Sequence, residues 1–268
     1  MYETTYHRPT SLDEAARLAS EMGDEAKYLS GGMTLIPTMK QRLAAPSALI
    51  DLRHVGDLKG ISVNGSSIRI GGGTTHAEIA ASSEIQSACP GFAGLAQLIG
   101  DPAVRHMGTI GGSVANFDPA ADYPAALLAL GATVHTNKRE MSADDFFVGM
   151  FETALEEGEI VTAVSFEAPE ASAYEKFRNP ASRYAMCGVY VAKRADGVKV
   201  GVTGAGADGA FRWSDAEQAL SSNFAPDAVG GLSVSEGDMV GDIHGSSAYR
   251  ANLVKVVTKR AVKKALGQ

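Results

Sequence analysis

The chain has 268 residues, of which 45% are hydrophobic and 21% charged, with a formal net charge of −7 at pH 7. This is the composition of a globular protein with room for two domains, and the negative charge gives no electrostatic footprint for nucleic acid. No apolar run reaches the roughly eighteen residues that a membrane span needs, and two cysteines, Cys89 and Cys187, are too few for an iron–sulfur site.

The opening residues lack the basic and apolar segments of a secretory signal. The two cysteines, far apart in the sequence, are typical of buried thiols in a reducing compartment. We therefore expect a cytoplasmic protein that holds no metal of its own.

The first fifty or so residues alternate between helix and strand signals. Ser11 and Glu14 form a capping box that predicts a helix ending at Gly23. The pattern then predicts a strand over 27–30, a helix over 37–45 that starts with Pro37, and a strand over 48–52. This alternation predicts a small α/β lobe.

The next hundred residues or so mix both kinds of element. Asn64-Gly65 lies between alternating apolar positions and predicts a β-hairpin over 61–70. Thr75 is a good N-cap, which makes Gly71-Gly72-Gly73 a structural turn and His76 a surface residue at a helix start. Further elements are helices over 90–100 and 119–130, a helical turn over 144–148, and strands over 132–136 and 159–167.

The last hundred residues follow a predicted linker over 169–172. Strands are predicted over 174–177, 186–193 and 198–204, the last two forming an antiparallel hairpin through Ala195-Asp196-Gly197. Helices are predicted over 214–220 and 246–266. The basic residues of the final helix fit a solvated face better than a patch for an acidic partner; they are Lys255, Lys259, Arg260, Lys263 and Lys264.

Two glycine turns carry the strongest indication of a ligand. Each follows a predicted strand and places consecutive glycines beside hydroxyl side chains, at Ser30-Gly31-Gly32-Met33-Thr34 and at Thr109–Ser113. Backbone amides in such turns form nests for phosphate oxygens, and glycine allows a close approach. Neither turn contains a P-loop or a G-x-G-x-x-G dinucleotide motif, so two turns that grip one pyrophosphate are the functional interpretation.

Polar residues follow the second turn at Asn116, Asp118 and Asp122. Their side chains suit hydroxyl groups better than further phosphate. The structural alternative is a strand, a glycine turn and a helix, with Asp118 as the N-cap before Pro119. The sequence pattern alone leaves both interpretations open.

Three segments, taken together, carry a family resemblance. GGMTLIP (31–37), RHMGTIGGSVAN with DPAADYPA (105–116 and 118–125), and YEKFRNPASRYAMCGV (174–189) are similar to the medium, FAD-binding subunits of the molybdenum hydroxylases. That group includes the flavoprotein subunits of aerobic carbon monoxide dehydrogenase and of xanthine dehydrogenase-like enzymes. Met33 and Ser113 depart from the family, which commonly has a smaller or polar residue and Asn at these positions.

The resemblance implies an α+β fold. Residues 1–170 would form a two-lobed FAD-binding domain of the enolpyruvyl-reductase/vanillyl-alcohol-oxidase (PCMH) type, with lobes of about 1–56 and 57–170. Residues 173–268 would form a smaller α+β domain of the carbon monoxide dehydrogenase flavoprotein type.

The resemblance also assigns the site. The backbones of Gly31–Leu35 and Thr109–Ser113 would bind the FAD pyrophosphate, and Asp122 a ribitol hydroxyl. Tyr184 would face the flavin ring, with Ile160 as a wall on its other side, although core packing explains both residues as well. The full set of expected FAD contacts is Leu29, Ser30, Gly31, Gly32, Met33, Thr34, Leu35, Thr109, Gly111, Gly112, Ser113, Asn116, Asp118, Asp122, Ile160 and Tyr184. Arg183 would stabilise a reduced anionic flavin or hydrogen-bond its own loop.

The function implied by the resemblance is electron transfer. No Ser/His/Asp, Cys/His or paired-carboxylate constellation stands out, so we expect no catalytic residue in this chain. FAD would pass electrons from a partner's iron–sulfur clusters to an external acceptor. The expected partners are a 2Fe-2S small subunit and a molybdopterin-binding large subunit, in a dimer of heterotrimers. The alternatives are a stand-alone FAD-dependent oxidoreductase with its own substrate pocket and a non-enzymatic scaffold that has lost flavin.

Overall fold

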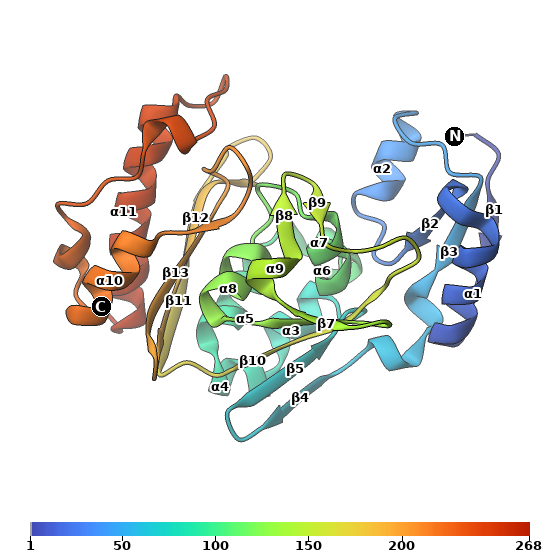
Figure 1. Ribbon diagram of the computed structural model, residues 1–268, viewed down its shortest axis with the longest axis horizontal. Coiled ribbons are helices and arrows are strands. Elements are labelled where there is room, and N and C mark those ends of the chain that lie inside the picture. The colour runs from blue at the N-terminus through green and yellow to red at the C-terminus, as the bar shows by residue number, and fades with distance from the viewer. Residues whose placement is uncertain (1) are drawn as a thin grey trace.

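The elements of the computed structural model, which describes residues 2–268, are arranged around three main sheets that follow one another along the chain (Figure 1). A small sheet with two helices lies at one end of the long axis, drawn in blue. A larger sheet with most of the helices occupies the middle, and a third sheet backed by two helices forms the other end. The predicted α+β class is confirmed.

The first sheet has the order β1-β3-β2, and its strands are parallel: β1 (Thr5–His7), β3 (Ala48–Asp51) and β2 (Ala26–Leu29). Helix α1 (Leu12–Met22) begins where the Ser11 hydroxyl accepts the amide of Glu14, and it ends at Gly23, whose φ is 60°. The 3-10 helices of this lobe are η1 (Gly23–Glu25), η2 (Leu52–His54) and η3 (Gly56–Leu58).

Helix α2 (Leu35–Lys40) differs from the predicted helix over 37–45. The amide of Ile36 donates to the carbonyl of Gly32 at 3.1 Å, so helical bonding begins inside the glycine turn. Pro37 falls within the first turn of the helix, where an N–H has no helical partner to lose. The helix ends early because Arg42 takes a left-handed conformation with φ 62°.

The middle sheet has the order β4-β5-β10-β6-β7, and every neighbouring pair is antiparallel. Its strands are β4 (Ile61–Asn64), β5 (Ser67–Gly71), β10 (Val161–Glu167), β6 (Thr133–Thr136) and β7 (Glu140–Ser142). The predicted hairpin at Asn64-Gly65 is confirmed, since β4 pairs with β5. A short hairpin, β8 (Phe147–Gly149) with β9 (Glu152–Thr153), precedes β10.

Short helices cover this sheet. They are α3 (His76–Ala81), α4 (Ser83–Ala88), α5 (Pro90–Gln97), α6 (Pro102–Met107), α7 (Ile110–Asn116), α8 (Tyr123–Leu130) and α9 (Ala143–Phe146). Thr75 caps α3 through a complete capping box with Glu78, as predicted. Every residue of α8 is buried, so this helix forms the centre of the core.

Two predictions around the second glycine turn are wrong. In the described residues no strand leads directly into Thr109, because α6 ends at Met107 and α7 begins at Ile110. Glycine is unfavourable in a helix interior. Position 111 nevertheless requires it, because a Cβ there would come within 2.7 Å of the Gly72 carbonyl oxygen. Helix α8 also starts later than Pro119, because Asp118 accepts the amide of Ala120 in a turn and caps no helix.

The third sheet has the order β11-β12-β13-β14 and is antiparallel: β11 (Ala171–Arg178), β12 (Ala185–Arg194), β13 (Gly197–Thr203) and β14 (Phe211–Arg212). The predicted β12–β13 hairpin is confirmed. Helices α10 (Ser214–Ser222) and α11 (Ser247–Ala265) follow, with η4 (Pro226–Val229) and η5 (Glu236–Asp238) between them. Strand β11 begins inside the predicted linker.

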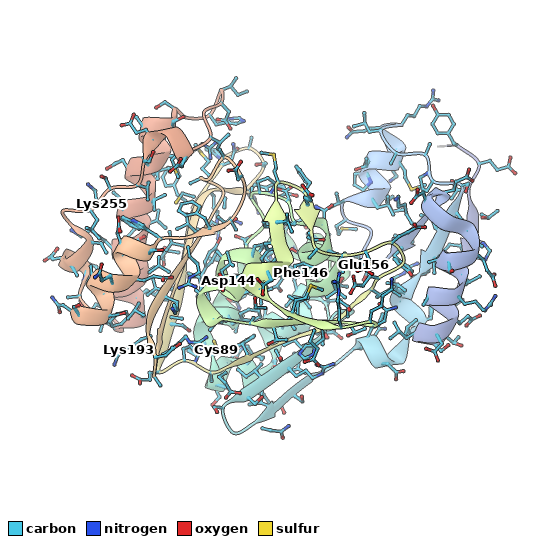
Figure 2. All side chains as sticks on the ribbon, in the orientation of Figure 1. Cys89, Asp144, Phe146, Glu156, Lys193 and Lys255 are labelled. Atoms are coloured by element: carbon cyan, nitrogen blue, oxygen red, sulfur yellow. The ribbon has the colours of Figure 1, made fainter. Side chains whose placement is uncertain are left out.

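Strand β12 joins two cores. Val189 and Val191 pack in the core formed with α10 and α11, whereas Tyr190 and Ala192 face the core of the middle sheet and its helices. Figure 2 shows Phe146 inside the middle layer and Lys255 on the outer side of α11. No helix within residues 2–268 is both long and apolar enough to cross a membrane.

Candidate functional site

A long cleft of about 1120 Å³ runs between the first lobe, the middle helices and the loop that joins β11 to β12. It exceeds the roughly 300–1,000 Å³ of a usual small-molecule pocket. Of the sixteen residues predicted as cofactor contacts, all line this cleft. The structure therefore brings the predicted residues together, although their contacts with a cofactor stay a prediction.

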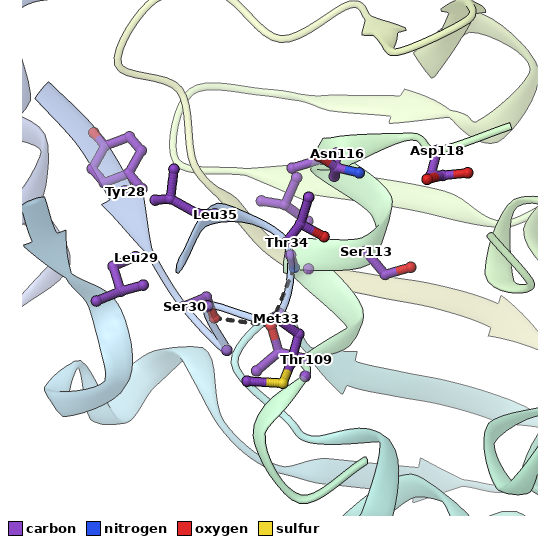
Figure 3. Close-up of a pocket in the computed structure, with 18 of the residues that line it drawn as sticks. Tyr28, Leu29, Ser30, Met33, Thr34, Leu35, Thr109, Ser113, Asn116 and Asp118 are labelled. Atoms are coloured by element: carbon purple, nitrogen blue, oxygen red, sulfur yellow. Dashed lines mark hydrogen bonds between the residues drawn. The ribbon is translucent and has the colours of Figure 1, made fainter. Parts of the chain in front are cut away.

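The two glycine turns contact each other directly at the middle of the cleft (Figure 3). The hydroxyl oxygens of Ser30 and Thr109 are 2.9 Å apart. A Cβ at Gly31 would lie 2.3 Å from the carbonyl oxygen of Met107 and 2.6 Å from the Cα of Gly108. Glycine at position 31 therefore permits the contact between the turns.

The first turn offers backbone donors. Among the hydrogen bonds of residues 2–268, none uses the amide of Gly31, Gly32, Met33 or Thr34 as its donor. Gly32 has a φ of 70°, a conformation that favours glycine. Successive amides around such a residue form a concave site for an anion. The geometry of this turn fits the phosphate interaction predicted from its sequence.

The second turn behaves differently, because its amides from Ile110 to Ser113 all donate within the protein. The amide of Gly111 donates to Gly72 O at 2.8 Å, and that of Ser113 to Thr109 O at 3.0 Å. The amide of Gly112 donates to the Thr109 hydroxyl, which caps α7. The second turn presents to the cleft the exposed backbone of Gly112 and the half-buried side chain of Ser113.

Asp122 lies buried in the wall of the cleft. Its Oδ1 accepts the Tyr174 hydroxyl at 2.5 Å, and its Oδ2 accepts Lys176 Nζ at 2.9 Å. Burial raises the pKa of the Asp122 carboxyl, and the Lys176 ammonium opposes that rise. Asn116 and Asp118 lie nearer the surface, at one end of the close-up in Figure 3.

The loop between β11 and β12 places Tyr184 at the same end. Asn179 closes this loop, since its backbone bonds to Tyr184 O and its side chain accepts the amides of Ala181 and Ser182. Arg183 is left-handed, with φ 64°. Tyr184 remains 51% exposed, and burial, followed by the charges of Asp118 and Asp122, raises its pKa.

Ile160 lines the cleft, and its role as a wall across the ring from Tyr184 stays a prediction. Ile160 is buried in the core of the first lobe, with Ala15, Ile50 and Leu58 among its partners. Its neighbour Gly158 accepts the Tyr28 hydroxyl at 3.0 Å, and Figure 3 shows Tyr28 far from Asp118. Alternating apolar residues predicted burial correctly but could not say in which core.

His76 begins α3, as predicted, but the alternative that it lies on the surface is wrong. His76 is 4% exposed, and its Nδ1 lies 3.2 Å from the Tyr123 hydroxyl. Burial, together with the charge of Arg105, lowers the pKa of His76 to about 4, so the ring is neutral near pH 7. Gly108 gives this ring room, because a Cβ there would lie 2.6 Å from Nε2.

The lining residues that sequence reasoning missed include Tyr28, His76 and Lys176. Tyr28 lies two residues before the first glycine turn, which is a usable signal. A single lysine in a strand gives none, because strands commonly carry lysine on a solvated face. Within residues 2–268 there is no group of three or more His, Cys, Asp or Glu residues arranged to hold a metal ion.

Comparison with known proteins identifies the ligand class of this cleft. Residues 2–169 match the FAD binding domain in molybdopterin dehydrogenase. The medium chain of carbon monoxide dehydrogenase from Afipia carboxidovorans is 35% identical over 97% of this chain and 96% of its own. The medium chain of glyceraldehyde dehydrogenase from Sulfolobus acidocaldarius is 32% identical over 97% of this chain and 98% of its own.

Solved structures agree over the whole chain. Carbon monoxide dehydrogenase from Hydrogenophaga pseudoflava matches with a TM-score of 0.90 and 32% identity, covering 99% of this chain and 98% of that one. Quinoline 2-oxidoreductase from Pseudomonas putida 86 matches with a TM-score of 0.87 and 28% identity, covering 98% and 97%. The FAD-binding part is thus of the PCMH type, as predicted.

The cleft fits FAD on its own geometry. Ser30 and Met33 of the first turn lie between Tyr28 at one end of the cleft and Asp118 at the other (Figure 3), and in the described residues the amides of Gly31–Thr34 are free to donate. A pyrophosphate with a nucleoside on one side and a polyol chain on the other has this order of groups. The chain belongs to the FAD-binding medium subunits of the molybdenum hydroxylases, and its cofactor is FAD.

Proposed function

We propose that this subunit is an electron relay: electrons from a partner's iron–sulfur clusters pass through its FAD to an external acceptor. The partners would be a 2Fe-2S small subunit and a molybdopterin-binding large subunit, assembled as a dimer of heterotrimers in the cytoplasm. The chain itself would divide into an FAD-binding domain over 1–170, with lobes of about 1–56 and 57–170, and a second domain over 173–268.

The observation that carries this proposal is one continuous cleft with distinct chemistry along its length. The amides of Gly31–Thr34 would hold the pyrophosphate, and Asp122, with Asn116 and Asp118, the ribitol hydroxyls. Tyr184, half exposed, would cover the ring at the end that stays open to other molecules. Bound FAD supplies the ability to take up and give off electrons singly or in pairs.

The chain's own residues favour a relay over a stand-alone oxidoreductase. At the Tyr184 end, Asp122 is tied into an ion pair and Asp118 into its own turn. Neither carboxylate is poised as a general acid or base. In the described residues the two thiols, Cys89 and Cys187, are buried and lie in separate cores, so the electron donor belongs to another chain.

The proposal is tested by reconstitution. The purified chain should pass electrons from an artificial donor to a dye, and should oxidise no hydroxylase substrate by itself. Addition of the iron–sulfur and molybdenum chains encoded with it should give substrate turnover. Substrate oxidation by the isolated chain would contradict the relay and favour a flavin enzyme with its own substrate pocket.

A further inference from the structure

A charged pair is buried in the wall of the cleft. Lys176 Nζ lies 2.9 Å from Asp122 Oδ2, and the two side chains are 2% and 6% exposed. Both residues line the cleft. Buried Lys and Asp side chains are rare unless they are paired, and removal of one partner leaves an uncompensated charge. A residue that pairs with a predicted cofactor contact therefore affects that contact.

Two donors fix the orientation of Asp122. The Tyr174 hydroxyl holds Oδ1 while Lys176 holds Oδ2, so a rotated carboxylate would lose one of the two bonds. An ionised carboxylate accepts about four hydrogen bonds. Each oxygen thus keeps acceptor capacity for a group in the cleft.

Both donors come from strand β11, where Tyr174 and Lys176 share one face. Strand β12 makes room for this arrangement, because a Cβ at Gly188 would lie 2.1 Å from the Tyr174 hydroxyl oxygen. Lys176 Nζ also lies 3.4 Å from the carbonyl oxygen of Leu98. The ammonium is therefore held on the protein side by Leu98 and directed at Asp122.

The remaining titratable groups near Asp122 come from four places. They are Arg178 on β11, Tyr123 on α8, Asp118 in the turn before α8 and Tyr184 in the β11–β12 loop. Burial raises the pKa of Asp122, and of the groups that lower it Lys176 has the largest effect. Without Lys176, the rise that burial causes in the pKa of Asp122 would be opposed much less.

We propose that Lys176 is a positioning residue for the cofactor: its ion pair holds the Asp122 carboxylate directed into the cleft, where the carboxylate accepts a hydrogen bond from a hydroxyl of the polyol chain. The inference rests on the proposed contact between Asp122 and FAD. Lys176 acts through Asp122 and needs no contact of its own with the cofactor.

The test is the equilibrium affinity of the full-length apoprotein for FAD, followed by flavin fluorescence between about pH 5.5 and 9. Wild-type affinity should fall on the acid side as Asp122 takes up a proton. Lys176→Met should move that fall upward by about 1–3 pH units, the usual effect of an opposite charge at this distance. Asp122→Asn should bind FAD more weakly, by roughly tenfold, and without the acid-side fall.

The double variant separates an indirect role from a direct one. In the Asp122→Asn background, Lys176→Met should weaken FAD binding by no further factor, because the group through which Lys176 acts has gone. Lys193→Met is the matched control, since Lys193 pairs with Glu170 at 2.8 Å at the exposed end of β12 in the same sheet. Its pH profile should superimpose on that of the wild type.

Tyr174→Phe keeps the test decisive if Lys176→Met does not fold. Loss of this hydroxyl should also move the acid-side fall upward. Two results would overturn the inference and leave the relay intact. One is that Lys176→Met weakens FAD binding equally at every pH. The other is that it weakens FAD binding by the same factor in the wild-type protein and in the Asp122→Asn protein. Unchanged affinity in Asp122→Asn would instead overturn the proposed contact together with the inference.

Discussion

The hydroxyl oxygens of Ser30 and Thr109 lie 2.9 Å apart, which joins two glycine turns separated by 79 residues. One turn ends a strand of the first lobe, and the other caps a helix of the middle layer. The first turn supplies amides to the cleft, and the second supports it from behind. Cofactor affinity should therefore depend on how closely the two turns pack.

Gly31→Ala should weaken FAD binding by about tenfold or more, because the new Cβ would lie 2.3 Å from Met107 O and the turns would have to separate. Overpacking of this kind also costs about 1–3 kcal/mol of stability. Gly94→Ala is the control, since that helical position has open space for a Cβ. Equal FAD affinity and melting temperature in the two variants would show that the turns do not constrain each other.

Gly112→Val and Gly32→Val should have different effects on stability. Gly112 is an exposed helical residue, so its valine variant should lose FAD affinity and keep most of its folding free energy. Gly32 has a φ of 70°, so its valine variant should also lose about 1–3 kcal/mol through backbone strain. Binding titrations and denaturant unfolding measure the two effects. Wild-type FAD affinity in both variants would mean that the glycines serve only the turns.

FMN should bind at least about 100-fold more weakly than FAD. The cleft continues past the first turn to Tyr28 (Figure 3), where FMN has no group to bury. Competition between the two flavins for apoprotein measures the ratio, and the flavin released from purified protein identifies the natural occupant. Equal affinities for FMN and FAD would show that the Tyr28 end of the cleft does not contribute to flavin binding.

Tyr184→Ala should change the absorption spectrum of bound flavin and the rate of reduction of an external acceptor. The side chain is 51% exposed, so folding stability should change by no more than about 0.5 kcal/mol. Tyr249→Ala, at a comparable 42% exposure on α11, is the control and should leave the spectrum unchanged. A wild-type flavin spectrum and a wild-type rate of acceptor reduction in Tyr184→Ala would show that the flavin ring does not contact Tyr184.

His76 should make stability depend on pH between about 6.5 and 4. The pKa of His76 is lower in the folded protein, so the unfolded chain binds the extra proton in this window and stability falls as the pH falls through it. The contribution, fully present above pH 6.5, amounts to about 3 kcal/mol. The unfolding free energy, measured by denaturant unfolding at several pH values, should depend less steeply on pH in His76→Gln than in the wild type. The exposed control His106→Gln should keep the wild-type pH dependence. A wild-type pH dependence in His76→Gln as well would contradict this prediction.

Capping and turn residues made much of the fold predictable. Ser11 and Thr75 cap the helices that their positions predicted, because a capping bond is local in sequence. Helix α7 was not predictable in this way. Its two consecutive glycines argue against a helix. The glycine at position 111 is explained only by its close packing against Gly72, which the sequence does not reveal.

The site was predictable in its members more than in their arrangement. The glycine turns and Asp122 all line one cleft, as their family motifs implied. The surroundings of Ile160 were not predictable, because an apolar residue in a strand pattern shows that it is buried and not what it is buried against. Lys176 was missed since its role depends on a partner 54 residues away in the chain.

The relay is tested most directly by rapid mixing of the assembled complex with its substrate, with the molybdenum, cluster and flavin signals followed separately. The account predicts that the molybdenum and cluster signals change first and the flavin signal last. A complex stripped of flavin should still show molybdenum reduction by substrate and should fail to be reoxidised by the natural acceptor. Reduction of the flavin by substrate while the molybdenum site is empty would contradict the account.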